Sequence, residues 1–236
     1  MNDSLYQNYV ERKHGTFAAW LVMRWHQKMF SFTESLALVR QRGRILEIGP
    51  GHGYLALHVN KLGYEYMFDD ISEPVVLKMT SLGFKRKGDT DSDFDLIYLS
   101  HVLEHCADWV SARSMLLERK GQLANGGVLV VIGPDYLNWK QQFFNVDATH
   151  GYPTTLRNVV QLMNDVGLQI EVAKHHRGGH VNWFGRSTYA TLSKVIPTFL
   201  DGLISPRRHR LGEGIVYSWK TVFGWRQLIV VARKMN

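Results

Sequence analysis

Cysteine, proline and long apolar runs are scarce in this sequence, and the shortages exclude several classes of protein. The only cysteine is Cys106, so an internal disulfide is impossible and the chain suits a reducing compartment. No apolar run approaches the ~20 residues that cross a membrane. The apolar stretch Phe17 to Met23 is short, ends at Arg24 and lacks a small-residue cleavage site, which argues against a signal peptide. We therefore expect a cytoplasmic protein with no transmembrane segment.

Most of the chain has no net positive charge, and the basic excess lies near its end. There are 28 Lys and Arg against 21 Asp and Glu, a formal net charge of +7. From Lys174 onward, 11 basic residues face 2 acidic ones, which leaves 17 against 19 for residues 1–173. A basic segment of this kind suits an anionic small molecule, a nucleic acid or an anionic membrane surface, or is simply a solvated face.

Short apolar runs alternate with helical patterns from residue 44 onward, which predicts a parallel sheet with helices on both faces. The predicted strands are 44–48, 64–70, a short one near 84, 94–100, 128–133, 168–173 and 226–233. The predicted helices are 53–62, 73–82 with Ser72 as its cap, 108–119 and 154–167, and "ANGG" at 124–127 is expected to form a turn. A chain of 236 residues needs only one core, so we predict one α/β domain with a doubly wound, mostly parallel seven-stranded sheet.

Two segments lie outside this alternation. We predict that residues 1–41 form an N-terminal helical extension that acts as a lid over the ligand-binding edge of the sheet. The same aromatic and methionine residues could equally be ordinary packing: Tyr6, Tyr9, Trp20, Met23, Trp25 and Met29. Residues 176–222 form a predicted basic helical or loop insertion before the last strand. The predicted core is then 44–175 together with 226–234.

The stretch "RILEIGPGHGYLALHV" at 44–59 places three glycines, Gly49, Gly51 and Gly53, between a strand and a helix. A phosphate loop needs G-x-x-x-x-G-K-[ST], and no such lysine follows. A dinucleotide fingerprint needs G-x-G-x-x-G, but the third required position is Tyr54. Both of those nucleotide sites are therefore disfavoured.

An acidic strand residue followed by alternating glycines, "EIGPGHG", resembles the first motif of the Rossmann-like (class I) S-adenosylmethionine-dependent methyltransferases. The likeness continues through "FDDIS" after the second strand, "GDTDSDFDLIYLSHVLEH" and "LANGGVLVVIGP", and covers 44–175 and 226–234. It implies a site for S-adenosylmethionine (SAM) and its product S-adenosylhomocysteine (SAH). The cofactor-binding residues that it implies are Glu47, Gly49, Gly51, Gly53, Asp69, Asp70, Asp89 and Ser100.

Each of these residue types suits a part of the cofactor. One carboxylate at a strand end can accept hydrogen bonds from both ribose hydroxyls, and we assign this to Asp70, with Asp69 as the competitor. Glu47 would orient the ammonium group, directly or through water. Asp89 would accept from the adenine amino group, or is an ordinary loop residue. Glycine lets the main chain approach the amino-acid part of the cofactor.

Histidines supply the candidate catalytic residues. "HVLEH" at 101–105 matches the H-x-x-E-H zinc pattern, in which His101 and His105 would share a helix face, but the pentapeptide is also common after the fourth strand of the methyltransferases. We predict no metal site and count His101 and His105 as candidate catalytic residues. His150, in "DATHGYPTT", could accept a proton from a substrate hydroxyl, or could simply cap or pack.

The acceptor is the least defined part of the predicted function. The chain lacks the N/D-P-P-Y/F/W motif of base amino-methylating enzymes and the Pro-Cys context of cytosine-C5 enzymes. We predict methyl transfer to a hydroxyl or carboxyl oxygen of a small-molecule or glycan-type metabolite, with nitrogen left open. Arg207, Arg208 and Arg210 suit an anionic acceptor. The alternatives are an RNA methyltransferase that uses "SPRRHRLGEG", and a non-catalytic regulator that binds the cofactor.

Overall fold

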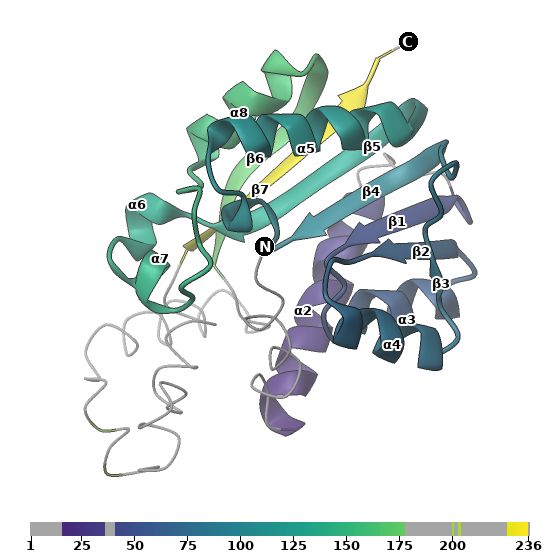
Figure 1. Cartoon of the computed structure of the whole chain (residues 1–236), viewed down its shortest axis with the longest axis horizontal. Helices are drawn as coiled ribbons and strands as arrows, with labels where there is room; N and C mark the ends of the chain where they lie inside the picture. Colours follow the sequence, from purple (N-terminus) through teal and green to yellow (C-terminus); the bar gives the residue numbers. More distant parts are fainter. Residues whose placement is uncertain (1–15, 36–40, 178–199, 201–202, 204–225, 236) are drawn as a thin grey trace.

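The central element is a seven-stranded sheet in the order β3-β2-β1-β4-β5-β7-β6 (Figure 1). This computed structural model describes residues 16–35, 41–177, 200, 203 and 226–235. Strands β1 to β5 pair in parallel, whereas β7 is antiparallel to both β5 and β6. The predicted doubly wound, mostly parallel seven-stranded sheet is confirmed.

The predicted strands and helices are present with small shifts of their ends. The strands are β1 Arg44–Ile48, β2 Glu65–Asp69, β3 Lys85–Arg86, β4 Phe94–Ser100, β5 Leu123–Pro134, β6 Leu168–Arg177 and β7 Arg226–Lys234. The long helices are α2 Thr16–Ser35, α3 Tyr54–Lys61, α4 Glu73–Ser81, α5 Trp109–Gln122 and α8 Leu156–Asp165. Three short helical segments, η2 Leu103–His105, α6 Tyr136–Trp139 and α7 Gln142–Asn145, were not predicted.

Helices cover both faces of the sheet (Figure 1). α5 and α8 pack on one face, over a core that includes Leu46, Leu129 and Met163. α2, α3 and α4 pack on the other face, over a core that includes Phe30 and Tyr98. The strand order reverses between β1 and β4, so the carboxyl ends of these two strands form the edge where such sheets bind ligands.

One local prediction was wrong, and a second holds only in part. "ANGG" lies inside β5 rather than in a turn, and the pairing of β4 with β5 shifts register there. The irregularity needs glycine, because a Cβ on Gly127 would stand 2.8 Å from the Phe94 carbonyl oxygen. Ser72 precedes α4 as predicted, but its hydroxyl makes no cap hydrogen bond. The cap at Asp108 is complete, since its carboxylate accepts from the Ser111 amide at 2.8 Å.

The N-terminal extension packs against the body of the protein through α2. Trp25, Met29 and Phe30 are buried in the core beside α3. For these three residues the structure shows ordinary core packing, which was the alternative to a lid. Tyr6 and Tyr9 lie outside the described residues. The lid over the ligand edge stays a prediction.

Most of the basic insertion also lies outside the described residues, including Arg207, Arg208 and Arg210. Its two ends are neighbours in the sheet, since Arg177 of β6 pairs with Arg226 of β7. Asp135 is fully buried beneath them and pairs with Arg226 at 2.6 Å and His175 at 3.2 Å. The ends of the insertion are therefore tied to the carboxyl end of β5.

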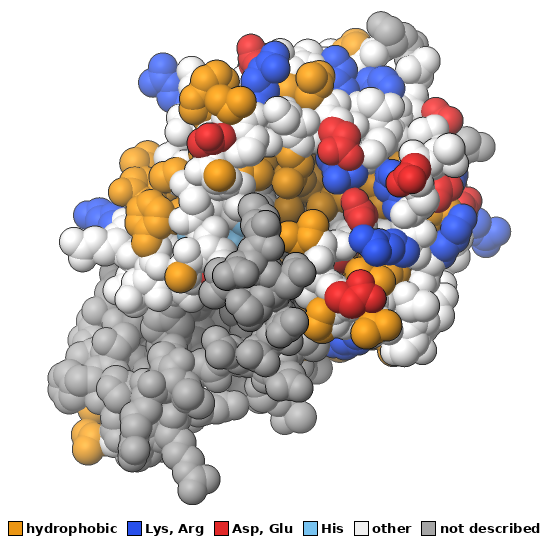
Figure 2. All heavy atoms as spheres, viewed as in Figure 1, with side chains coloured by type: hydrophobic (Ala, Val, Ile, Leu, Met, Phe, Trp, Pro, Cys, Tyr) orange, Lys and Arg blue, Asp and Glu red, His pale blue; other side chains and the backbone are white. Residues whose placement is uncertain are grey.

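The described surface carries mixed charge. Figure 2 shows Lys and Arg side chains interspersed with Asp and Glu side chains on the described part of this face. The mixture agrees with the near-balance of charge in residues 1–173. No helix among the described residues is long and apolar enough to cross a membrane.

Candidate active site

The glycine turn between β1 and α3 is pinned to the neighbouring strand, because the Gly49 amide donates to the Asp69 carbonyl at 2.9 Å. All three glycines have positive φ, at 68°, 53° and 75°. A Cβ on Gly49 would stand 2.7 Å from Val102 and one on Gly53 would stand 2.8 Å from Met79, whereas one on Gly51 would meet nothing within 4 Å. Side-chain packing therefore favours glycine at the outer two positions, whereas the Cβ position of Gly51 is open as far as the described residues go.

Glu47 is a buried acid on the face of β1 that is covered by α2 and α3. It is 1% exposed and accepts a hydrogen bond from the Tyr66 hydroxyl at 2.5 Å. Burial raises the pKa of Glu47 to about 8, against the opposing Tyr66 hydrogen bond, and the charge of Asp70 adds to the rise. Glu47 is therefore mostly protonated at neutral pH until a cation approaches it.

Two hydroxyl groups on β4 lie on the same side of the sheet as Glu47. Tyr98 is the register partner of Glu47, and Ser100 is two residues further along β4. Both hydroxyls are buried and make no hydrogen bond within the described residues. Buried polar atoms without partners are uncommon, so this edge of the sheet suits a polar ligand. The sequence predicted Ser100 but missed Tyr66 and Tyr98.

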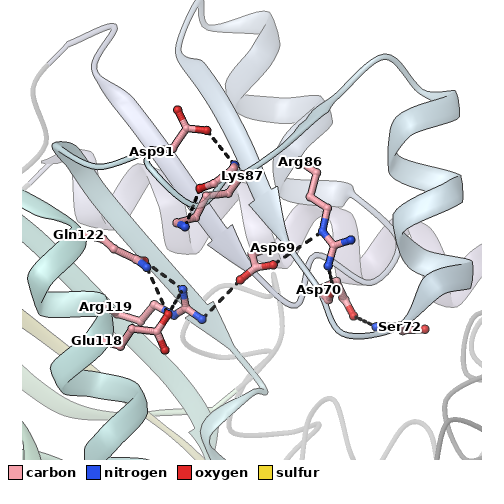
Figure 3. Close-up of polar contacts among 10 residues, drawn as sticks. Asp69, Asp70, Ser72, Arg86, Lys87, Asp91, Glu118, Arg119 and Gln122 are labelled. Carbon is pink, nitrogen blue, oxygen red and sulfur yellow. Dashed lines mark hydrogen bonds and ion pairs between the residues drawn. The ribbon is translucent and has the colours of Figure 1, made fainter.

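Asp69 and Asp70 have different surroundings (Figure 3). The Asp69 carboxylate faces α5, where it pairs with the buried Arg119 at 3.4 Å, and it lies 3.9 Å from Arg86. The Asp70 carboxylate accepts from the Ser72 amide at 2.8 Å. Asp69 is thus engaged in ion pairs, while the Asp70 carboxylate makes none with the described residues, although Arg86 donates to the Asp70 main-chain carbonyl at 3.0 Å.

Burial raises the pKa of Asp70 to about 6, and the nearby Asp69 charge adds to the rise against the opposing amide hydrogen bonds. A charge partly stripped of water in this way gains when a ligand donates hydrogen bonds to it. This favours Asp70 over Asp69 for the ribose, which stays a prediction.

Asp89 stands apart from these groups. It is exposed in the loop between β3 and β4. The neighbouring Asp91 holds this loop, because its carboxylate accepts from the Gly88 amide at 2.8 Å and lies 3.7 Å from Arg44. The adenine role of Asp89 stays a prediction.

His101 and His105 do not share a helix face as the zinc pattern requires. The chain forms only the short 3-10 turn η2 here, and His101 precedes it with a left-handed φ of 57°. His101 Nδ1 instead contacts Glu104 Oε1 at 3.1 Å. The zinc pattern of the pentapeptide is therefore not realised by these two histidines.

His105 lies against His150 instead, with ring centroids 4.9 Å apart. Glu104, His105 and His150 each place one potential ligand atom within 4.8 Å of the others. Glu104 is fully buried, and its Oε2 makes no hydrogen bond within the described residues. The sequence predicted both histidines as candidates but missed Glu104. The only signal available was its place between His101 and His105.

α2 adds aromatic side chains to the same edge. The Trp25 ring lies 6.2 Å from the His101 ring, and the His26 ring lies 6.4 Å from Tyr54 and 6.5 Å from Tyr98. The Trp25 indole N–H is buried and makes no hydrogen bond within the described residues. Residues from α2, the glycine turn and β4 thus meet at the carboxyl ends of β1 and β4.

A sheet of this order, with a glycine turn and strand-end carboxylates at its switch point, has the architecture of the Rossmann-like SAM-dependent methyltransferases. Residues 22–173 match the model of a family described as methyltransferase domain, and the chain belongs to that family. It is therefore a SAM-dependent methyltransferase. None of the curated proteins matches the chain.

Solved structures share the fold at low sequence identity. A SAM-dependent methyltransferase from Archaeoglobus fulgidus is 16% identical, with a TM-score of 0.59 over 89% of this chain and 94% of that one. The cyclopropane synthase MmaA2 from Mycobacterium tuberculosis is 13% identical, with a TM-score of 0.58 over 87% and 84%. Coclaurine N-methyltransferase bound to N-methylheliamine and SAH is 16% identical, with a TM-score of 0.56 over 88% and 71%.

The residues present fit SAM. No described residue would block a ligand that approaches the main chain at Gly51. The hydroxyls of Tyr98 and Ser100, which make no hydrogen bond within the described residues, lie on the same side of the sheet as Glu47, an acid that can ionise for an ammonium group. SAM supplies the activated methyl group when bound. The chain's own residues bind and orient it, and alignment of two bound reactants contributes on the order of 7–11 kcal/mol in favourable cases.

Replacing Gly51 with alanine should reduce SAM affinity by roughly tenfold or more, because a methyl group would fill the space at the turn. The positive φ of Gly51 makes the same change cost about 1–2 kcal/mol of stability. Gly53→Ala is the matched control, since it introduces similar backbone strain and also displaces Met79. We expect it to lower the unfolding free energy by roughly 2–4 kcal/mol in total. Calorimetric SAM titration and thermal unfolding separate the two effects. Equal SAM affinity in Gly51→Ala and wild type would contradict this placement of the cofactor.

Proposed function

We propose that this methyltransferase transfers the SAM methyl group to a hydroxyl oxygen of a small molecule. The observation that carries the proposal is the group of hydrogen-bond acceptors that Glu104, His105 and His150 bring together within 4.8 Å after β4. A ligand that enters among acceptors must bring a proton or a positive charge. A hydroxyl does so, whereas a carboxylate would be repelled by Glu104.

His150 is the best placed proton acceptor. Its Nδ1 lies 2.5 Å from the Phe143 carbonyl, which can only accept, so the proton is on Nδ1 and the lone pair is on Nε2. Burial lowers the pKa of His150, which keeps the ring neutral at physiological pH. A general base in such a position contributes about 10²–10⁴-fold for a hydroxyl acceptor.

A nitrogen acceptor is the second candidate, because one structural neighbour is named as an N-methyltransferase. A protonated amine would lose its proton to the same lone pairs. The RNA alternative depends on residues 205–214, which lie outside the described residues, as do the arginines that suggested an anionic acceptor.

The proposal is tested by measuring SAH release from SAM with panels of hydroxyl, amine and carboxylate compounds. We expect turnover in the hydroxyl panel, with kcat falling at acidic pH as His150 becomes protonated. His150→Gln should lower kcat by about 10²–10⁴-fold with little change in SAM affinity. His58→Gln, on α3, is the control. Turnover restricted to amines would replace the hydroxyl assignment, and an unchanged kcat in His150→Gln would refute the base.

A further inference from the structure

Glu104, His105 and His150 together provide more basic groups than the removal of one proton requires. They combine one carboxylate with two imidazoles, all partly or fully buried. The two chain segments that carry them are locked together, because the Glu104 carbonyl accepts from the amides of Gly151 at 2.9 Å and Tyr152 at 3.1 Å. Only glycine permits this approach, since a Cβ at Gly151 would stand 2.5 Å from the Cys106 carbonyl oxygen.

The hydrogen bonds of His105 leave its Nε2 with a lone pair. Its Nδ1 lies 2.6 Å from the Thr149 hydroxyl. That hydroxyl donates its own proton to the Asp147 carboxylate at 2.6 Å. The Thr149 oxygen must therefore accept from His105 Nδ1–H. Histidines that bind metals usually hold their other ring N–H in this way, with a carboxylate or carbonyl behind it.

His150 is held in the same tautomer by a carbonyl group. Because Phe143 offers only an oxygen acceptor to Nδ1, the Nε2 atom of His150 also carries a lone pair. Both imidazoles thus have their Nδ1 protons engaged outside the cluster, and the Nε2 atom of each carries a lone pair that can bind a cation. This is the form in which histidine ligates metals.

Glu104 supplies an unpartnered anionic oxygen. Its Oε1 contacts His101 at 3.1 Å, whereas its Oε2 makes no hydrogen bond within the described residues although the side chain is fully buried. A buried carboxylate oxygen beside two lone pairs is costly unless a cation joins them.

We propose that Glu104 Oε2 and the Nε2 atoms of His105 and His150 bind one divalent transition-metal ion of the Zn²⁺, Mn²⁺, Fe²⁺ or Co²⁺ class. Imidazole and carboxylate ligands suit these ions, and three protein ligands leave a position open for a further oxygen. Ligand atoms about 2.1 Å from a tetrahedral ion are about 3.4 Å apart, so a pair of donor atoms at the 4.8 Å limit would have to close by about 1.4 Å.

The role of the ion rests on the proposed function, although its binding does not. An acceptor hydroxyl in the open position would have its pKa lowered by the metal charge, and its proton would leave to solvent or a nearby base. The oxygen lone pair would then form the bond to the methyl carbon as the carbon–sulfur bond breaks, with the electron pair returning to sulfur to give neutral SAH. With the ion bound, His150 is a ligand rather than the base.

The test uses the untagged chain, stripped with a chelator and titrated separately with Zn²⁺, Mn²⁺ and Co²⁺. We expect one ion per chain and Co²⁺ absorption bands typical of nitrogen and oxygen ligands. Glu104→Gln, His105→Ala and His150→Ala should each weaken binding at least tenfold. Thr149→Val should weaken it by about 10–100-fold through the lost support of His105. His58→Gln should bind as the wild type does.

Two outcomes would overturn the site: no stoichiometric binding, or binding that none of the ligand variants weakens. SAM titration of the same samples keeps the two proposals apart. Loss of metal binding in a variant that still binds SAM and folds shows that the metal effect is local. Stoichiometric metal binding without turnover of any hydroxyl compound would leave the site standing and remove the proposed function.

Discussion

Asp70→Asn should weaken SAM binding by on the order of 100-fold, because a hydrogen bond to a charged group contributes about 1.5–3 kcal/mol and the ribose offers two donors. An asparagine keeps the size of the side chain and one oxygen, but it loses the charge and the second acceptor. The Asp70 carboxylate accepts from the Ser72 amide and makes no ion pair among the described residues, so the substitution breaks none there. Calorimetric titration with SAM and SAH measures the loss directly.

Asp69→Asn is the matched control for Asp70→Asn, since it makes the same chemical change one residue away. Asp69 pairs with Arg119, which is largely buried, and lies near Arg86. The control should therefore reduce thermal stability and leave SAM affinity within a few-fold of wild type. The reverse result, with affinity lost in Asp69→Asn and kept in Asp70→Asn, would assign the ribose to Asp69.

The raised pKa of Asp70, about 6, adds a pH signature to this prediction. Below that pH Asp70 is neutral in the free protein. Its carboxyl must then lose a proton before it can form charge-assisted hydrogen bonds to the ribose. The affinity advantage of wild type over Asp70→Asn should accordingly shrink as the pH falls from 7 to 5. A constant ratio of the two dissociation constants across this range would contradict it.

The elements of the fold were predictable from sequence where one periodicity dominates. β1 and β4 have the predicted bounds because each is an apolar run between clear turns. "ANGG" was misread since its glycines indicate a turn, whereas their function is a close approach of β5 to the Phe94 carbonyl. α6 and α7 span only four residues each, too few for a helical period to register.

The candidate site was predictable to the extent that it lies on single segments. The glycine turn and Asp70 belong to local motifs, which sequence spacing shows. The approach of His150 to Glu104 depends on backbone hydrogen bonds between segments 46 residues apart. No local pattern reports that contact. The neighbours of Glu47 are predictable only in part. Tyr66 and Tyr98 lie on the same side of the sheet as Glu47, and this follows once the strand order and register are known.

Glu47→Gln should make the protein more stable at alkaline pH, which is unusual for the loss of a buried hydrogen-bonded acid. Burial raises the pKa of Glu47 from 4.5 to about 8 in the folded state. The folded protein thus holds a proton that the unfolded chain releases above pH 4.5. Wild-type stability should fall as the pH rises from about 4.5 to about 8, and the full cost, up to about 5 kcal/mol, is present above pH 8.

Glutamine carries no charge at any pH, so Glu47→Gln lacks this cost and its stability curve should be flatter. Denaturant unfolding of both proteins at pH 5 and pH 9 checks the sign. The difference in unfolding free energy should favour the variant at pH 9 by several kcal/mol more than at pH 5. Parallel curves would mean that Glu47 is ionised in the folded protein at both pH values.

The same acid explains how a buried carboxyl can serve a cationic ligand. SAM brings an ammonium group, and if that group lies near Glu47 it stabilises the ionised form and lowers the pKa of Glu47. SAM binding near pH 7 should then release a proton from the wild type. Titrations in two buffers of different ionisation enthalpy count that proton. Glu47→Gln should bind more weakly and release fewer protons, whereas proton release equal to that of wild type would place the ammonium group away from Glu47.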